Sequence, residues 1–514
     1  MKTLVGIDAG TTAITTVAYD TSGSALATAT KTQSVDRPDT GQSELDMGAV
    51  WDRTRETITR VVARLGEHVE IAGVGITGQG DGCWLIDTNG EPVRDAVLWS
   101  DSRAAPMLET WKEDGTMDAL VETCGSSVYP GTCLPILTWL AEHEPETLER
   151  ATTAFSCKDW LGYNLTGARV TDYTEATVPF LDRETGEFEP TVFEWAGIPE
   201  RSDLIPDVHS GTDVIGTVTS DAASETGLPE GTPVVAGTID VVASAVGAGA
   251  VTPGDGAVSL GTSLFAQTIT EGPGADGRGI GMAFGIDDRW TTAIGSNAGT
   301  PSLEWVCEAL LEKEEIETLE PIAAAAAAGS GGVLFLPYLS TTGERGPFID
   351  PNARAGFVGL TPEHTRAHVV RSVYEGLSLA VRDCIEHLPA TPNRVYLTGG
   401  GSRSAFWCEV LADCLGIELL VPETEYPAAK GAATLLAVGL GIESSLKRAG
   451  SRLGETEQHY EPNGDIAETY DELYEHYRRT RRDMQPIWER RAELQRIHDS
   501  GPVVSACTGG ENDQ

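Results

Sequence analysis

Lysine is scarce in this chain, and positive charge as a whole falls far short of negative charge. Among 514 residues, 36 are Lys or Arg and 78 are Asp or Glu, which gives a formal net charge of −42. Only seven of the basic residues are Lys. A charge of this size repels the phosphates of nucleic acids and the anionic surface of a membrane. Neither partner is therefore expected.

Long hydrophobic runs and paired-cysteine motifs are also missing. No apolar stretch reaches the about 18 residues that a membrane span needs, and the alanine run at 323–328 ends at Gly329. The nine Cys form no CxxC motif, so a disulfide or zinc framework has no support. The chain opens in a strand pattern rather than a leader sequence. We therefore expect a cytoplasmic protein.

The acidic residues are spread along the whole chain, with apolar runs between them. A high net charge can also indicate a disordered chain, but disorder does not account for those apolar runs. At about 1 M salt the Debye length is about 3 Å, so surface carboxylates hardly repel one another. We interpret the composition as an adaptation to high salt, as in a halophile.

Strand and turn patterns predict an α/β protein built from two related domains. Strands are expected at 3–7, 13–19 and 24–30, with a helix at 51–65. Residues 256–269 repeat the opening strand–turn–strand pattern. The Gly/Ala/Pro-rich stretch 247–256 is typical of a linker. The expected units are domains 1–248 and 249–460, a helix over 461–499 and a disordered tail over 500–514.

The turn Gly10-Thr11-Thr12 follows Asp8 at the end of the first predicted strand. Glycine lets backbone N–H groups approach an anion, and the hydroxyls can donate as well. A carboxylate such as that of Asp8 suits Mg²⁺, which prefers few protein ligands together with phosphates. An ordinary β-turn is the alternative. The second turn, Gly261-Thr262-Ser263, favours the phosphate role because two such turns could hold one polyphosphate.

Two further loops contain residues that could do chemistry. Asp240 follows an apolar strand, so it is either a helix N-cap or a functional acid. The glycine loop 399–401 lies between a predicted strand and a predicted helix, where a nucleotide can approach the backbone. A plain strand-to-helix turn would also contain glycine.

Polar residues that suit sugar hydroxyls follow two strands of the first half. They are Gln79, Asp81, Asp101 and Arg103. Each hydroxyl of a polyol needs a donor or an acceptor, and these side chains supply both. Surface loops also carry such residues without any binding role.

Together these motifs resemble the FGGY family of carbohydrate kinases. The resemblance extends from Gly6 to about Gly441. It rests on 6–12, 77–82, Trp99-Ser100-Asp101-Ser102-Arg103, 237–240, 259–263, Leu336-Pro337-Tyr338-Leu339, 343–345, 351–354, 357–360, 398–404 and 428–437.

The resemblance implies two RNase H-like domains of the actin and hexokinase ATPase type, with a cleft that closes on ATP and a sugar. It makes Asp240 the general base and Asp8 a partner of Mg²⁺. The implied ATP contacts are Gly10, Thr11, Thr12, Gly261, Thr262, Ser263, Gly400, Gly401 and Ser404.

The sugar loop, 78–85, and residues 343–348 look most like the branch that includes xylulose and erythritol kinases. We expect Gly80 to leave room for substrate and Asp81 to accept two hydroxyl hydrogen bonds. The implied sugar contacts are Gln79, Gly80, Asp81, Asp101, Arg103 and Asp240.

The predicted activity is ATP-dependent phosphorylation of a terminal hydroxyl of a small ketose or polyol. A xylulose-type pentulose is the first choice, and erythritol or another polyol is the alternative. A sugar sensor without transfer activity is the alternative from a different class. The oligomeric state is left open, with a homodimer as one option.

Overall fold

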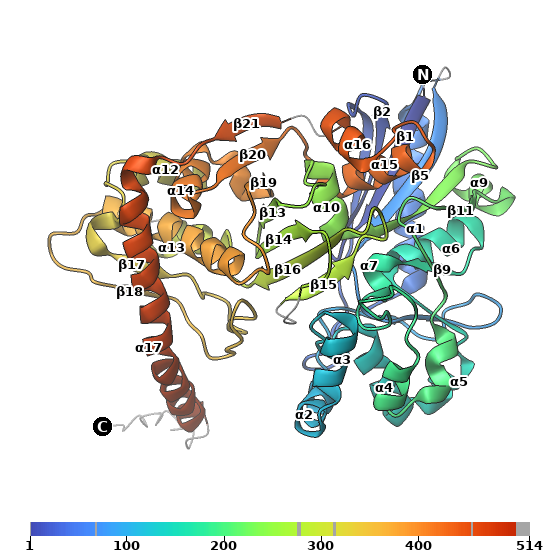
Figure 1. Ribbon diagram of the computed structural model, residues 1–514, viewed down its shortest axis with the longest axis horizontal. Coiled ribbons are helices and arrows are strands. Elements are labelled where there is room, and N and C mark those ends of the chain that lie inside the picture. The colour runs from blue at the N-terminus through green and yellow to red at the C-terminus, as the bar shows by residue number, and fades with distance from the viewer. Residues whose placement is uncertain (1, 67–68, 275–278, 312–314, 454–455, 500–514) are drawn as a thin grey trace, which may run out of the picture.

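The computed structural model describes residues 2–66, 69–274, 279–311, 315–453 and 456–499. The predicted disordered tail over 500–514 lies outside the described residues. Two mixed sheets form the frame of the molecule, with helices between and around them (Figure 1). Within the described ranges, no helix is both long and apolar enough to cross a membrane.

The first sheet has the strand order β11-β12-β5-β1-β2-β3. Its strands are β1 (Lys2–Ala9), β2 (Ala13–Asp20), β3 (Ala25–Thr32), β5 (Glu70–Gly78), β11 (Val214–Thr217) and β12 (Pro233–Ile239). β1, β2 and β3 are antiparallel neighbours, whereas β5 runs parallel to both β1 and β12. The three predicted opening strands are confirmed.

The second sheet has the order β15-β16-β14-β13-β19-β20-β21. Its strands are β13 (Asp255–Leu260), β14 (Leu264–Thr270), β15 (Ile280–Ala283), β16 (Trp290–Ser296), β19 (Arg394–Thr398), β20 (Glu418–Pro422) and β21 (Thr456–Tyr460). β13 pairs antiparallel with β14 and parallel with β19, as β1 does with β2 and β5. The predicted internal repeat and the RNase H-like α/β fold are confirmed.

Helix α1 (Met47–Arg64) shows how the sequence sets an element. Asp46 caps it by accepting a hydrogen bond from the Ala49 backbone N–H. Val50, Ile58 and Val61 form its buried face. The helix therefore begins four residues earlier than the apolar spacing alone predicted.

Helices α10 (Asp240–Ala248) and α15 (Pro427–Gly439) lie between the two sheets (Figure 1). Their backbones approach closely because glycine lies at the contact. A Cβ on Gly431 would be 1.8 Å from the Ala243 carbonyl oxygen. α15 also packs on the first sheet, where a Cβ on Gly75 would be 2.1 Å from the Ala432 carbonyl oxygen.

Replacing Gly431 with Ala is expected to destabilise the protein by about 1–3 kcal/mol, because the added methyl group meets backbone. The matched control is Gly48→Ala in α1, where Gly48 is exposed and only the Asp46 side chain is near. This control should be neutral or stabilising, since Ala favours helix by about 1 kcal/mol. Denaturant unfolding measures both variants. Equal stability of the two variants contradicts the packing argument.

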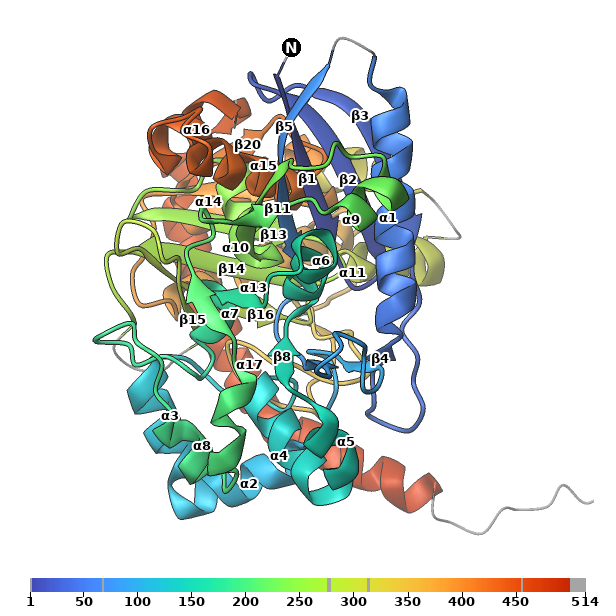
Figure 2. The same ribbon diagram turned by 90° about the vertical axis from the view of Figure 1, so that its right-hand side faces the viewer.

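A helical insertion lies between β5 and β12, and part of it gathers below the first sheet (Figure 2). Its helices are α2 (Ala105–Asp114), α3 (Thr116–Cys124), α4 (Cys133–His143), α5 (Pro145–Arg150), α6 (Cys157–Thr166), α7 (Tyr173–Ala176), α8 (Thr191–Trp195), η1 (Pro199–Leu204) and α9 (Ser220–Thr226). Its short strands are β6 (Trp84–Ile86), β7 (Ala96–Val97), β8 (Thr153–Phe155), β9 (Val170–Asp172) and β10 (Asp207–His209), and β7 pairs with β4 (Glu44–Leu45).

After β6 the dipeptide Asn89-Gly90, typical of hairpin turns, reverses the chain. A turn does form there, with Gly90 at φ 86°. The ladder partner of β6, however, is β8, more than sixty residues later. Across the turn itself, the structure has two isolated antiparallel bridges, Ile86 with Pro92 and Cys83 with Val97.

Helices of the second half surround its sheet. They are α11 (Pro301–Trp305), η2 (Val306–Leu310), η3 (Ile316–Thr318), α12 (Leu319–Ala323), η4 (Ser330–Gly332), α13 (Arg366–Glu386), η5 (Gly400–Arg403), α14 (Ala405–Leu415), α16 (Leu446–Leu453), η6 (Gly464–Ile466) and α17 (Ala467–Asp499). β17 (Leu334–Leu336) pairs with β18 (Gly356–Val358). α17 runs along the outer edge and carries the buried Tyr470, Tyr477 and Trp488 (Figure 1).

Candidate active site

Three loops meet at one edge of the first sheet because their strands are parallel neighbours in register. Asp8 of β1 lies beside Thr77 of β5, and Ile239 of β12 lies beside Gly78. These strands are therefore followed, side by side, by the Gly10–Thr12 turn, the sugar loop and the start of α10. Residues far apart in the sequence thus reach one place, as the carboxyl ends of neighbouring parallel strands do.

Gln79 links the sugar loop to the predicted phosphate turn. Its Oε1 accepts a hydrogen bond from the Thr11 hydroxyl at 3.0 Å. Trp99 Nε1 in turn donates to the Thr11 hydroxyl oxygen at 3.0 Å. Gln79 Nε2 is buried and has no partner within the described structure, so both N–H donors of its NH₂ group remain for a ligand.

Asp81 is held from two sides. Its backbone has φ 54°, and its N–H donates to Glu175 Oε2 at 2.9 Å. Its carboxylate accepts a hydrogen bond from the Tyr129 hydroxyl at 2.6 Å. Tyr129 and Glu175 were not predicted, because they are 48 and 94 residues away in the sequence and no local pattern announces either contact.

Asp101 and Arg103 bind each other. Asp101 Oδ1 accepts from Arg103 Nε at 2.9 Å, and Asp101 Oδ2 accepts from the Ser43 backbone N–H at 2.7 Å. Arg103 Nη2 also donates to Glu44 at 2.5 Å. These contacts stabilise the loop, and a direct sugar contact by either residue stays a prediction.

The space beside Gly80 does not stay open for substrate, contrary to expectation. A Cβ on Gly80 would lie 1.8 Å from Ile239 Cδ1 and 3.4 Å from Glu175 Oε1. Ile239 is buried and precedes Asp240. The missing side chain at Gly80 therefore accommodates protein, and it lets the β12–α10 connection pack against the sugar loop.

Asp240 is the first residue of α10, and Ile239 is the N-cap residue. The N-cap alternative for Asp240 is therefore wrong. Burial, and next the charge of Asp8, raise the pKa of Asp240 to about 8. Burial likewise raises the pKa of Asp8 to about 7 and that of Asp81 to about 6, although the Tyr129 hydrogen bond opposes the rise at Asp81. Perturbed carboxyl groups gathered at one edge are typical of a functional site.

These three pKa values predict that the ligand-free protein loses stability as pH rises through about 6–8. The pKa of each group is higher in the folded state than the ordinary value of 3.8, so folding favours the protonated form. That contribution is full below pH 3.8, decreases as pH rises above this value, and is lost completely once each group has ionised in the fold. Ordinary surface carboxylates are already ionised in this window.

Thermal unfolding between pH 5.5 and about 9 tests this prediction. Asp240→Asn removes the group with the highest of the three pKa values and should flatten the slope. An Asp240→Asn slope equal to that of the natural chain contradicts the assignment.

The second sheet presents its own loops at the ends of β13 and β19. Ser259 lies beside Thr398 in register, which brings Gly261-Thr262-Ser263 close to the glycine loop. A Cβ on Gly399 would be 2.6 Å from the Leu260 carbonyl oxygen, whereas one on Gly400 would meet nothing within 4 Å. Ser404 caps α14 by accepting from the Trp407 N–H at 3.1 Å.

Arg345 connects the two halves of the chain. Its guanidinium lies 5.6 Å from the centre of the Trp99 ring. Glu344 fixes the segment, because its carboxylate accepts from the backbone N–H groups of Asn297 and Arg345, each at 2.8 Å. The sequence resemblance included this segment, but the contact with Trp99 was not predicted.

Asp8 fits a magnesium ligand. Its Oδ1 is buried and has no hydrogen-bond partner within the described ranges. Among the residues the structure covers, no group of three or more His, Cys, Asp or Glu is arranged to hold a metal ion. This arrangement suits Mg²⁺ held by one carboxylate together with nucleotide phosphates and water.

Comparison with known proteins shows which proteins this chain is similar to. Residues 3–247 match the N-terminal domain of the FGGY family of carbohydrate kinases, and residues 256–440 match its C-terminal domain. The erythritol kinase of Brucella abortus is 31% identical over 95% of this chain and 98% of its own. The L-xylulose/3-keto-L-gulonate kinase of Escherichia coli is 30% identical over 86% of this chain and 89% of its own. The crystal structure of xylulose kinase from Rhodospirillum rubrum superposes with a TM-score of 0.87 at 28% identity, covering 95% of this chain and all of that one.

Proposed function

The chain belongs to the FGGY family of carbohydrate kinases, and from this membership we propose that it transfers the γ-phosphoryl group of ATP to a terminal hydroxyl of a small ketose or polyol. The observation that carries the proposal is the meeting of Asp8, Asp81 and Asp240 at one sheet edge. Phosphoryl transfer depends mostly on positioning and on neutralising charge. This edge supplies positioned carboxylates next to a Gly-Thr-Thr turn.

Asp240 is the general base in this proposal. It takes the proton of the attacking hydroxyl while that oxygen bonds to the γ-phosphorus and ADP leaves. Its position at the start of α10, next to the sugar loop, keeps it within the same cluster as Asp81. A raised pKa near the working pH suits proton transfer in both directions of the catalytic cycle.

ATP is bound from both halves of the chain. Gly10, Thr11 and Thr12 with Gly261, Thr262 and Ser263 bind the phosphates, and Gly400, Gly401 and Ser404 contact the adenosine. Mg²⁺ at Asp8 would neutralise phosphate charge when bound. The N-terminal unit, 1–248, then carries the sugar and the base, and the unit 249–460 carries the nucleotide.

A xylulose-type pentulose is the first proposed substrate, and Gln79, Gly80, Asp81, Asp101 and Arg103 form the sugar loops. Erythritol is the second, favoured by the 31% identity to a kinase of that name over nearly the whole chain. A sensor without transfer activity is disfavoured by the presence of Asp240. The acidic composition further supports a protein adapted to high salt, and we propose a cytoplasmic location.

An ADP-release assay in molar KCl with Mg²⁺-ATP tests the proposal. The sugar panel contains D-xylulose, L-xylulose, xylitol, erythritol, ribulose and glycerol. We expect one of the pentuloses or erythritol to give the highest kcat/KM. If the folded protein releases no ADP with any sugar of the panel, the proposed substrate class is contradicted.

A further inference from the structure

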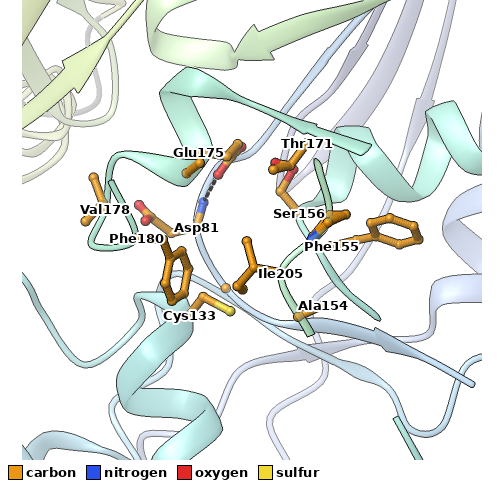
Figure 3. Close-up of a pocket in the computed structure, with 13 residues that line it drawn as sticks. Asp81, Cys133, Ala154, Phe155, Ser156, Thr171, Glu175, Val178, Phe180 and Ile205 are labelled. Carbon is orange, nitrogen blue, oxygen red and sulfur yellow. Dashed lines mark hydrogen bonds between the residues drawn. The ribbon is translucent and has the colours of Figure 1, made fainter. Parts of the chain in front are cut away.

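Glu175, on the short helix α7, has one carboxylate oxygen engaged and one free. Its Oε2 accepts the hydrogen bond of the Asp81 backbone N–H at 2.9 Å, and Figure 3 shows this contact. Its Oε1 is buried and has no hydrogen-bond partner in the described part of the chain. A buried acceptor without a donor costs free energy. The free oxygen therefore needs either a proton or a hydroxyl from a ligand.

Charge around Glu175 does not satisfy the free oxygen. Lys158, a cation whose charge acts on Glu175, is already paired with Asp172 at 2.8 Å and with Asp159 at 2.5 Å. Burial raises the pKa of Glu175 well above its usual range despite Lys158, and the charge of Asp81 adds to the rise. The natural partner for the oxygen is thus a neutral hydrogen-bond donor.

Glu175 and Asp81 line one cavity, which Figure 3 shows. Ser156 and Thr171 contribute polar atoms to the wall, and Val178 and Phe180 contribute apolar surface. The cavity has a volume of about 30 Å³, enough for about two water-sized groups. A hydroxymethyl end of a sugar chain is of this size, whereas a whole sugar ring is not.

We infer that Glu175 contacts the sugar, with Oε1 accepting a hydrogen bond from a substrate hydroxyl while Oε2 holds Asp81 in place. This inference rests on the proposed function and narrows its substrate class. The two carboxylates select an open-chain substrate whose hydroxyl groups reach the cavity that both residues line. A site built to bind a hydroxyl discriminates strongly against analogues that lack it.

The variant Glu175→Gln distinguishes the roles of the two carboxylate oxygens. The amide oxygen can still accept from the Asp81 N–H, and the amide NH₂ then replaces the free oxygen, which turns an acceptor into a donor. We expect the KM for the preferred sugar to rise about 10–100-fold, because the buried substrate hydroxyl loses its acceptor. The KM for ATP should stay unchanged. Glu184→Gln, at an exposed position nine residues later in the sequence, is the matched control and should behave like the natural chain.

Sugar-induced thermal stabilisation without ATP gives a second readout. We expect the sugar to raise the Tm of the natural chain and of Glu184→Gln, and to raise that of Glu175→Gln much less. If the natural chain is stabilised by sugar but releases no ADP, the kinase proposal fails, and the Tm shifts still decide the role of Glu175. If sugar does not change the Tm of the natural chain, both the kinase proposal and the proposed role of Glu175 are overturned.

Glu175→Ala identifies a purely supporting role. If Glu175→Gln binds sugar like the natural chain and only Glu175→Ala is impaired, Glu175 merely holds Asp81, and the inference is overturned.

Discussion

Asp240→Asn is expected to lower kcat by about 10²–10⁴-fold, the contribution typical of a general base. The sugar KM should change little, because Asn keeps the shape of Asp. Asp221→Asn, at an exposed position in α9, is the matched control and should keep full activity. Steady-state kinetics measure both variants. Full activity of Asp240→Asn would remove the residue from the proton-transfer role.

The pH profile distinguishes a base from a binding residue. If Asp240 is the base, kcat/KM of the natural chain should rise with pH up to about 8, where the carboxyl group ionises. In Asp240→Asn the residual activity should lack this rise. An unchanged profile in the variant contradicts the assignment even if the rate falls.

Dilute buffer is expected to destabilise the protein strongly. The net charge of −42 means that excess carboxylates repel one another in the folded state. For a sphere of about 30 Å radius, lowering the ionic strength from about 1 M to about 0.01 M raises this repulsion about fivefold. An unfolded chain spreads the same charges farther apart. We therefore expect Tm to fall by about 10 °C or more.

Thermal unfolding across a KCl series measures this effect. NaCl at equal ionic strength should act like KCl, because screening depends on charge and concentration. Sucrose, which is uncharged, should not replace either salt at equal osmolality. A Tm that is the same in dilute buffer and in molar salt contradicts the proposed adaptation.

Local patterns were sufficient to predict the frame of the fold. The strand–turn–strand units at Gly10–Thr12 and Gly261–Ser263 lie within single sequence windows, so alternation and glycine predicted them. The packing of α15 on the first sheet was not predictable in this way. It brings Ala432 next to Gly75 from the other half of the chain, and no single-window pattern records such a contact.

The candidate site was predicted only in part for the same reason. Asp8 lies near the end of β1 and Asp240 directly follows β12, so their position at a sheet edge follows from the sequence. The roles of Tyr129 and Glu175 depend on loops that meet Asp81 only in the folded chain. The filling of the Gly80 space by Ile239 is likewise a tertiary contact, which a residue's size alone does not reveal.

The yield of phosphorylated sugar per ADP, measured in molar KCl with Mg²⁺-ATP, tests the central claim most directly. We predict one sugar phosphate for each ADP released with the preferred ketose or polyol, and no ADP without sugar. ADP formed at the same rate without sugar would indicate an ATPase. Sugar binding with no ADP at all would indicate a sensor, and either result would contradict the kinase proposal.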